Sequence, residues 1–503
     1  MCLDRPSAGS RDAGTTAFSR STRSVMRATF QHRRLRVSVW LLCGTWVVSL
    51  GAAGADLRLV DAAKHKEWEA VGVLLRQQLD VDTAQADGAT ALHWAAYWNE
   101  RDTLERLIGA GANVDAENDY GATPLWVACA NRHARIVKRL LEDGANPNMG
   151  LRSGETLLMR CAHTGDAAAV RALLTHGADV HATEPSRGQT ALMWAVANRH
   201  PDVTRVLLEH GAAVDARTTA VRQLRGTGER STTSPQGATY FDAGGFTPLL
   251  FAARHGALDS ARLLLDAGAD LNDSAADGNS ALVMAAMSGH GQLGELLLDR
   301  GADPDASGAG YAALHAAVLR SQPGLVRALL ATGANPNARL VKSTPVPRWT
   351  YQFIFTLREK GATPFMLAAK YLEPEMLRML AGGGADPLLS MEDGTTTLMA
   401  AVGLGLNRST NRRSRLIAPE LVAAEWANED LVLDTVKAAV DAGAAVGGVI
   451  NETGRGGNTA LHGAARNRFR TVVAFLVAQG GDLDIANEDD TTPQELLDRL
   501  DAS

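Results

Sequence analysis

A sequence plan of about 33 residues recurs along most of this 503-residue chain, and this repetition constrains the fold more than any other feature. A unit this short cannot bury its own apolar face, so similar units stack and each completes the core of its neighbour. The chain is therefore expected to form one elongated array in which burial is added repeat by repeat. The position that opens each unit is held by Thr90, Thr123, Thr156, Thr190, Thr247, Ser280, Ala312, Thr363, Thr396, Thr459 and Thr492.

Residues 115–148 show the plan within one unit. A side-chain oxygen at Thr123 can accept hydrogen bonds from free backbone N–H groups at a helix start, where Pro124 fits the first helical position. The pattern predicts a short helix from there to about Asn131 and a second, amphipathic helix that begins near Ala134. A glycine then ends the second helix in a left-handed conformation. This closing position is held by Gly111, Gly144, Gly177, Gly211, Gly268, Gly301, Gly333, Gly384, Gly443 and Gly480.

These units resemble the ankyrin repeat. The segments Thr90-Ala-Leu-His-Trp-Ala-Ala and Thr459-Ala-Leu-His-Gly-Ala-Ala are similar to that family's Thr-Pro-Leu-His-x-Ala signature, and the resemblance runs from Asp56 almost to the C-terminus. It implies an all-α solenoid of about 11 to 12 helix-turn-helix repeats with hairpin fingers between them. The family's general role is to bind other macromolecules. In that family the signature histidine bonds backbone between turns, which is the structural role expected here for His93, His315 and His462.

Residues 1–55 differ from the array. A short arginine cluster precedes Val37–Leu50, a mostly apolar run, and small residues then end at Ala55 as in a signal peptidase site. We expect residues 26–55 to be a secretory signal peptide cleaved after Ala55, preceded by a disordered leader or mis-called start over residues 1–25. The apolar run is shorter than the ~20 residues of a membrane span, which favours the signal peptide. The alternative is an uncleaved N-terminal membrane anchor.

The charge balance of the array argues against a nucleic-acid partner. Residues 1–55 carry a net charge of +6 and the whole chain −6, so the remainder carries −12. A nucleic-acid binder would be expected to show a basic face. The balance fits a soluble, exported protein with neutral or basic partners. We expect secretion, or the periplasm of a bacterium given the Ala-, Gly- and Arg-rich composition.

Three insertions interrupt the repeat spacing. The intervals predict 24 extra residues near 217–245 and 18 near 339–360, both in the turn that joins two repeats. A third insertion of 26 residues near 405–431 separates the two helices of one repeat. Long irregular loops inside a compact array are usually either functional or disordered, and for the first insertion both readings stay open.

The second and third insertions have different compositions. The third contains an arginine cluster and a possible extra helix over residues 419–426, and we interpret it as a solvated loop. The second contains aromatic residues that alternate as on one face of a strand, which predicts that they pack on the array or on a partner. These aromatic residues are Trp349, Tyr351, Phe353 and Phe355.

Two local features of the array remain. Residues 56–88 lack the threonine opening and carry a polar exterior, which is typical of a terminal cap. Cys129 and Cys161 occupy first helices of adjacent repeats, where the family has small alanines. We expect two buried free thiols, because neighbouring helices lie about 10 Å apart and a disulfide needs a closer approach.

No arrangement of residues in the sequence predicts an enzyme. We find no histidine pair at metal-ligand spacing, no paired cysteine motif, no nucleophile elbow and no phosphate-binding glycine loop between a strand and a helix. We therefore expect a monomeric, non-enzymatic scaffold without cofactor, metal, nucleic-acid partner or membrane span in the mature chain. The alternative is a hydrolase-like enzyme with a site built on the insertions, since a fold alone does not fix function.

The resemblance also implies a binding surface, a strip made of the finger tips and the exposed side of each first helix. Aromatic and arginine residues are enriched among interface anchors, so those at strip positions are expected to contact a protein or peptide. Packing between repeats is an equal alternative for Trp94, Trp194 and Phe251. The predicted strip contains Trp94, Tyr97, Trp98, Tyr120, Arg152, Arg160, His163, Arg187, Trp194, Phe246, Phe251, Arg254, His255 and Tyr311, with Trp349 and Tyr351 of the second insertion leaning over its end.

Overall fold

The computed structural model describes residues 56–226, 238–342, 355, 359–404 and 428–501. The predicted signal peptide lies outside these residues. The chain divides into two compact units, Met1–Ala145 and Asn146–Ser503, and each is described by itself. In both units a first helix and a second helix form a pair, and an extended turn leads to the next pair.

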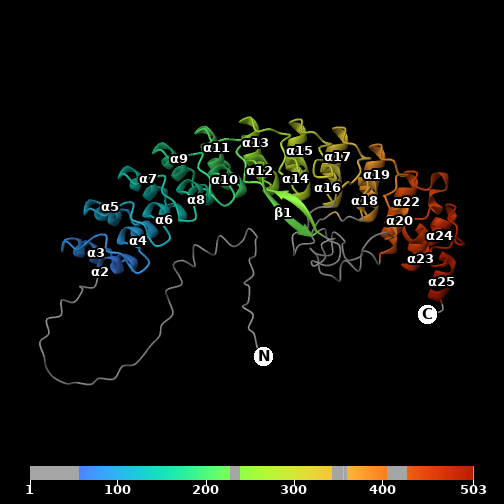
Figure 1. Ribbon diagram of the computed structural model, residues 1–503, viewed down its shortest axis with the longest axis horizontal. Coiled ribbons are helices and arrows are strands. Elements are labelled where there is room, and N and C mark those ends of the chain that lie inside the picture. Colours follow the sequence, from blue (N-terminus) through green and yellow to red (C-terminus); the bar gives the residue numbers. More distant parts are fainter. Residues whose placement is uncertain (1–55, 227–237, 343–354, 356–358, 405–427, 502–503) are drawn as a thin grey trace, which may run out of the picture. The chain divides into compact units, whose positions relative to one another are not determined.

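Unit 1 contains the N-terminal helix pairs (Figure 1). Its first helices pack side by side in one row, and each packs on the second helix of its own pair. The predicted cap over residues 56–88 has the same two-helix plan as the others. The pairs are α2 (Arg58–Lys64) with α3 (Trp68–Leu75), α4 (Ala91–Trp98) with α5 (Arg101–Gly109), and α6 (Pro124–Ala130) with α7 (Ala134–Glu142).

Unit 2 continues the plan in two layers, and its first helices form the inner layer in Figure 1. The inner layer contains α8 (Leu157–Thr164), α10 (Ala191–Ala197), α12 (Pro248–His255), α14 (Ala281–Ser288), α16 (Ala313–Leu319), α18 (Pro364–Lys370), α20 (Thr397–Ala401), α23 (Ala460–Arg466) and α25 (Pro493–Asp501). The outer layer contains α9 (Ala167–Thr175), α11 (Pro201–Glu209), α13 (Leu258–Asp266), α15 (Gly291–Asp299), α17 (Pro323–Ala331), α19 (Pro374–Gly382), α22 (Glu429–Asp441) and α24 (Arg470–Ala478). Two short 3-10 turns, η4 (Val446–Asn451) and η5 (Arg455–Gly457), precede α23.

The helix boundaries follow the predicted start and stop residues. Thr123 caps α6, where its hydroxyl accepts a hydrogen bond from the backbone N–H of Trp126 at 3.1 Å. Gly144 follows α7 with a φ of +91°. No atom lies within 4 Å of the place where its Cβ would be, so conformation and not space favours glycine there. The other predicted closing glycines also have positive φ.

The core of each pair is the apolar face of the second helix packed on the first. In α7 the predicted stripe of Ile136, Val137, Leu140 and Leu141 is buried. Full burial of such a side chain contributes about 1.5–3 kcal/mol. The stripe therefore stabilises the pair through apolar burial, as the helical spacing predicted.

The three signature histidines are structural, which confirms the prediction. The Nδ1 atom of His462 accepts a hydrogen bond from the backbone N–H of Thr459 at 3.0 Å. Its Nε2 atom lies 3.0 Å from the carbonyl oxygen of Thr491, to which it donates when Nδ1 is the acceptor. Each ring thus joins a helix start to the following turn. The same bonds link His93 to Thr90 and Ala122, and His315 to Ala312 and Ala362.

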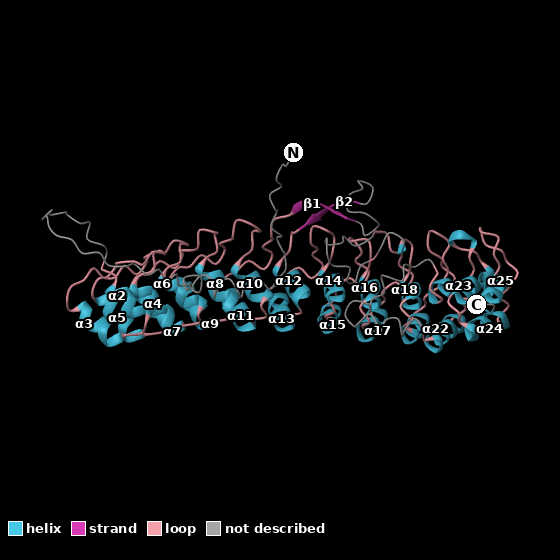
Figure 2. Cartoon of the chain, turned by 90° about the horizontal axis from the view of Figure 1, so that it is seen from below, coloured by secondary structure: helices cyan, strands magenta, loops and turns pink. Residues whose placement is uncertain are grey.

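The first insertion forms a hairpin at its described ends. Strand β1 (Val221–Gly226) pairs in antiparallel register with β2 (Ala238–Ala243), so that Leu224 faces Tyr240 across the ladder. Figure 2 shows the hairpin projecting from the edge where the connecting turns lie. Of the two readings that the sequence left open, the described stems of this insertion favour order. The residues between the strands, 227–237, lie outside the described part of the chain.

An arginine ties the start of each finger insertion to the next turn. Arg217 donates from Nη1 to the carbonyl oxygens of Gly245 at 3.1 Å and Ser274 at 3.2 Å. Arg339 donates from Nη1 to the carbonyl oxygen of Ser390 at 2.9 Å. Both insertions therefore leave and re-enter the array at a closed base, which lets the neighbouring repeats keep their stacking.

One aromatic residue of the second insertion packs on the array. Phe355 is fully buried, with its ring centroid 5.0 Å from Tyr311 and 6.3 Å from His315. This contact agrees with the expectation that the insertion packs its aromatic residues instead of exposing them. The other three residues of the alternating set, Trp349, Tyr351 and Phe353, lie outside the described residues.

The third insertion ends earlier than predicted. Asn428 caps α22 by accepting a hydrogen bond from the backbone N–H of Leu431 at 3.2 Å, so the second helix begins at Glu429. The last residues assigned to the insertion belong to this helix. The arginine cluster and the expected extra helix over residues 419–426 fall within 405–427, outside the described residues.

The expectation of two free thiols is wrong. Cys129 and Cys161 are fully buried, as predicted, but both are disulfide-bonded. The prediction compared the spacing of helix axes with the reach of a disulfide. Axis spacing does not give the distance between the sulfur atoms, and this is the reason for the error.

Candidate interaction surface

In unit 1 the predicted strip residues on α4 form an aromatic cluster. The ring centroid of Tyr97 lies 5.8 Å from that of Trp94 and 4.6 Å from that of Trp98. Trp94 is only 7% exposed and therefore packs between repeats, the alternative left open by the sequence. Trp98 donates from Nε1 to the carbonyl oxygen of Lys64 at 3.2 Å, and the ammonium group of Lys66 lies 3.8 Å from its ring centre. Tyr97 and Trp98 are half-buried.

Tyr120 is the open aromatic residue of the strip in unit 1, with 52% of its surface exposed. It lies in the turn before α6. The side-chain oxygen of Asn118 accepts hydrogen bonds from the backbone N–H groups of Tyr120 at 3.0 Å and Ala122 at 2.9 Å. The turn is thus fixed while the ring stays in solvent, which is the arrangement expected of an interface anchor.

Two of the predicted strip residues in unit 2 are buried structural groups. Arg160 on α8 pairs with Glu155, with 2.6 Å between Nε and Oε1. Burial raises the pKa of the Glu155 carboxyl group, and the charge of Arg160 opposes this shift. Tyr311 is also buried, and its hydroxyl donates to the side-chain oxygen of Asn279 at 3.0 Å. Contrary to the prediction, neither Arg160 nor Tyr311 is presented on the strip.

A polar and aromatic contact joins two neighbouring repeats of unit 2. His163 at the end of α8 packs edge-on against Trp194 of α10, with ring centroids 5.6 Å apart. The Nδ1 atom of His163 lies 3.0 Å from the side-chain nitrogen of Asn198. Burial and then the charge of Arg160 lower the pKa of His163. Of these groups only Asn198 is well exposed, and Arg152, another predicted strip residue, is exposed on the turn before α8.

Helix α12 carries the densest group of predicted residues. The ring centroids of Phe246 and Phe251 lie 5.7 Å apart, and the His255 ring is stacked on Phe251 at 6.1 Å. The guanidinium carbon of Arg254 lies 5.6 Å from the centre of the Phe246 ring. Phe251 is buried, whereas Arg254 and Arg187 are exposed. The structure therefore brings Phe246, Phe251, Arg254 and His255 together, and the charge of Arg187 acts on Arg254.

Electrostatic repulsion shapes the titration of this group. Burial, followed by the charges of Arg254 and Arg199, lowers the pKa of His255 to about 4. Burial and then the charge of Arg187 lower the pKa of Arg254, while Asp277 opposes this shift. At neutral pH His255 is therefore an uncharged ring, and the arginines carry the positive charge of the surface.

Sequence reasoning missed three residues that belong to this surface. Arg199 donates from Nε to the carbonyl oxygen of His255 at 2.6 Å. Arg320 donates from Nη2 to the carbonyl oxygen of Ser288 at 3.3 Å, and His290 bonds the carbonyl oxygen of Arg254. All three lie in or beside the turn between the two helices of a pair. Charged and histidine residues in that turn were a sequence signal for this surface. The prediction missed them because it considered only first-helix and finger positions.

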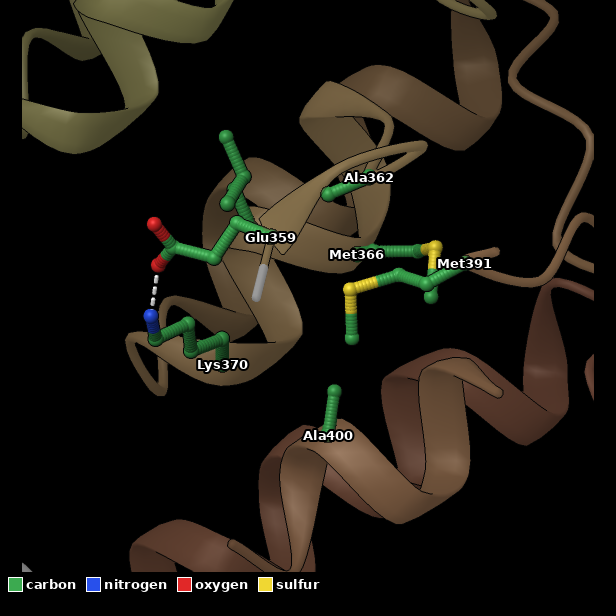
Figure 3. Close-up of a pocket in the computed structure, with 7 residues that line it drawn as sticks. Glu359, Ala362, Met366, Lys370, Met391 and Ala400 are labelled. Carbon is green, nitrogen blue, oxygen red and sulfur yellow. Dashed lines mark hydrogen bonds and ion pairs between the residues drawn. The ribbon is translucent and has the colours of Figure 1, made fainter. Parts of the chain in front are cut away.

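A small cavity in unit 2 holds a buried ion pair (Figure 3). Lys370 at the end of α18 pairs with Glu359, and their side chains are only 8% and 2% exposed. Burial lowers the pKa of the Lys370 amine to about 7. Neither group is presented to the surface, so the arrangement is suited to holding the second insertion on α18. The cavity is lined by Glu359, Ala362, Met366, Leu367, Lys370, Met391 and Ala400.

No group of three or more histidine, cysteine, aspartate or glutamate residues among the described residues is placed to hold a metal ion. No helix in the same residues is long and apolar enough to cross a membrane.

The fold and this surface define a class, a solenoid of stacked helix pairs whose first helices and fingers carry aromatic and arginine side chains. The family model "Ankyrin repeats (3 copies)" matches residues 59–150, 145–218 and 249–339, and the model "Ankyrin repeat" matches residues 456–488. Together the matches cover more than half of the 503 residues. The chain belongs to the ankyrin repeat family.

A solved structure is also similar to this chain. The crystal structure of the human ASB11 ankyrin repeat domain has 27% sequence identity, and the match covers 49% of this chain and 98% of that one, with a TM-score of 0.40. Ankyrin repeat proteins are generally non-enzymatic scaffolds with protein partners. The repeats of this chain therefore indicate a protein–protein interaction scaffold.

Proposed function

We propose that the chain is an exported scaffold that binds a protein or peptide along the predicted strip in each unit. The observation that carries the binding proposal is the contiguous group Phe246, Phe251, Arg254 and His255 on and beside α12, flanked by the exposed Arg187. Aromatic and arginine side chains gathered on one rigid element are typical of interface anchors. In unit 1 the exposed Tyr120 supplies a further anchor.

Site-specific photocrosslinking tests the surface. A photoreactive amino acid placed at Tyr120 or Arg187 should crosslink a partner from the exported fraction. The same group at the exposed Arg135 of α7 or Arg262 of α13, both on second helices, should not. Crosslinking from the second helices alone would contradict the proposal.

Alanine substitution of the exposed anchor measures its share of binding. Tyr120→Ala should weaken capture of the crosslinked partner by roughly 1 to 4 kcal/mol while the helical circular dichroism signal stays intact. Trp98→Ala should weaken capture similarly, but the half-buried ring also packs against Lys66, so its variant needs the same folding control. Unchanged capture with Tyr120→Ala, together with loss on substitution of the second helices, would show that the strip is the wrong surface.

Export rests on separate observations. The leader ending at Ala55 has the pattern of a cleaved signal peptide. The disulfide-bonded state of Cys129 and Cys161 fits an oxidising compartment such as the bacterial periplasm. N-terminal sequencing of protein from the exported fraction should begin at Asp56. Recovery of residues 26–55 still attached in the membrane would show an anchor instead.

A further inference from the structure

A row of three aromatic rings runs along α12 on the predicted strip of unit 2. Phe246 lies in the turn before the helix, Phe251 within it and His255 at its end, and the centroid distances of 5.7 Å and 6.1 Å make the row continuous. The rings of Phe251 and His255 are nearly parallel, with an interplanar angle of 8°. The row is a rigid apolar floor, because each ring is held by its neighbour.

Three arginines lie around this floor. Arg187 lies in the preceding finger, Arg254 on α12, and Arg199 at the turn between α10 and α11, where its Nε bonds the carbonyl oxygen of His255 at 2.6 Å. Within the described chain, no carboxylate oxygen forms an ion pair with any of the three. The charge of Asp277 in the next finger opposes the lowering of the Arg254 pKa without forming an ion pair with that side chain.

This surface thus keeps like charges near one another at the end of α12, where Arg199 bonds the carbonyl oxygen of His255. Burial, followed by the charges of Arg254, Arg199 and His290, lowers the pKa of His255. A carboxylate placed there would remove the repulsion and gain charge-assisted hydrogen bonds. Guanidinium groups suit carboxylates particularly well, because their planar donors match both oxygens.

We propose that the surface formed by Arg187, Arg199 and Arg254 around the Phe246–Phe251–His255 row binds an acidic peptide segment of the partner. The inference rests on the proposed scaffold function and specifies the chemistry of its ligand. It differs from the expectation drawn from net charge, because a chain that carries −12 outside its leader still places three arginines around this row. Local charge governs docking, while net charge acts at long range.

The same charge distribution favours a short peptide over a nucleic acid. A polyanion longer than the patch would extend onto the rest of a chain whose net charge outside the leader is −12, which disfavours its binding. A short acidic segment instead places its carboxylates near the arginines and its remaining atoms against the aromatic floor. The arginines then supply charge recognition, and the half-buried rings of Phe246 and His255, backed by the buried Phe251, supply apolar contact.

Fluorescence anisotropy with synthetic probes tests the proposal on the purified full chain. The probe is a short labelled peptide of alternating Glu and Ala, compared with versions in which Gln or Lys replaces Glu. The Glu peptide should bind at least about tenfold more tightly than either version, and its affinity should fall as salt rises. Equal affinity for the Glu and Gln peptides would overturn the proposal, as would tighter binding of single-stranded DNA of similar length.

Substitutions then locate the site. Arg254→Gln and Arg199→Gln should each weaken Glu-peptide binding about tenfold, whereas Arg254→Lys should weaken it less, because it keeps the charge and loses only the planar donors. Arg262→Gln on the outer helix α13 is the matched control and should leave binding unchanged. Loss of binding in the control as well would overturn the assignment. If the crosslinked partner is captured normally by Arg254→Gln and Arg199→Gln, the acidic-peptide inference fails while the scaffold function stands.

Discussion

The ammonium group of Lys370 pairs with the carboxylate of Glu359 in an almost water-free site between α18 and the end of the second insertion. Ala362, Met366 and Met391 line the same cavity and surround the pair with mostly apolar side chains. Removing two charges from water is costly, and such a pair is retained when each group satisfies the other. The pair therefore fixes where the insertion re-enters the array.

Removing one partner of this pair should destabilise the site more than removing both. Lys370→Met leaves the Glu359 carboxylate buried and unpaired, which should cost about 3–5 kcal/mol. The double variant Lys370→Met/Glu359→Leu should recover most of this loss, because no charge remains buried. Hydrogen exchange of the α18 and α19 amides measures the opening free energy. As a control, Lys360→Met breaks the exposed 3.1 Å pair with Glu392 and should change it by less than about 1 kcal/mol. A double variant no better than Lys370→Met would contradict this account.

Truncation of Phe355 should loosen the second insertion and the repeat beneath it. The side chain is fully buried and contacts Tyr311 and His315, so Phe355→Ala leaves a cavity that should cost about 3–5 kcal/mol. Thermal unfolding and limited proteolysis around residues 339–360 provide the readout. Tyr240→Ala is the comparison, because that ring is 63% exposed and its loss should leave the unfolding temperature nearly unchanged. Equal effects of the two variants would show that Phe355 packing is unimportant.

Buried neutral histidines should make the array sensitive to acid. Burial lowers the pKa of His315 from 6.5 to about 4 in the folded chain. Between these values the unfolded chain binds a proton that the folded chain excludes, so the free energy of unfolding decreases as the pH falls. This contribution is fully present above pH 6.5 and is lost progressively towards pH 4, at roughly 1 kcal/mol per pH unit.

Urea unfolding at several pH values between 7 and 4 tests this dependence. His315→Gln removes the titrating group while keeping an amide that can bond backbone, so its stability should fall less steeply over the same range. His93 and His462 also have lowered pKa values and should continue to contribute in that variant. An unchanged slope in His315→Gln would show that this histidine is not responsible.

Unfolding should proceed by progressive loss of repeats more than by one all-or-none step. Within each unit a helix pair packs mainly on its immediate neighbours, so stability is close to a sum of local terms. The insertions near 217–245, 339–360 and 405–431 are the expected weak joints. Circular dichroism, tryptophan fluorescence and hydrogen exchange should report different midpoints. A single sharp transition seen identically by all three would contradict this prediction.

The strip shows how far the position of a residue in its repeat predicts its role. Counting from Thr247 correctly placed Phe251, Arg254 and His255 together on α12, because the helical period fixes which positions share a face. The same count placed Arg160 on the strip, but Glu155 holds that side chain in a buried pair. A sequence does not show whether a long side chain such as that of Arg160 forms a buried ion pair or lies exposed on the surface.

The sequence by itself determined the repeated helix pair, its threonine starts, its glycine ends and the structural role of His93, His315 and His462. The helix starts and ends depend on backbone conformation and on residues a few positions apart, so a single repeat contains them. The histidine role followed from the family resemblance, because each ring also bonds the turn of the next repeat. Tertiary structure alone decided that Arg199 reaches His255, that Phe355 packs on Tyr311, and that Lys370 pairs with Glu359. These contacts join residues of different repeats or of an insertion and the array. They depend on how the units stack and on which neighbour each long side chain contacts. No local sequence pattern encodes either of these.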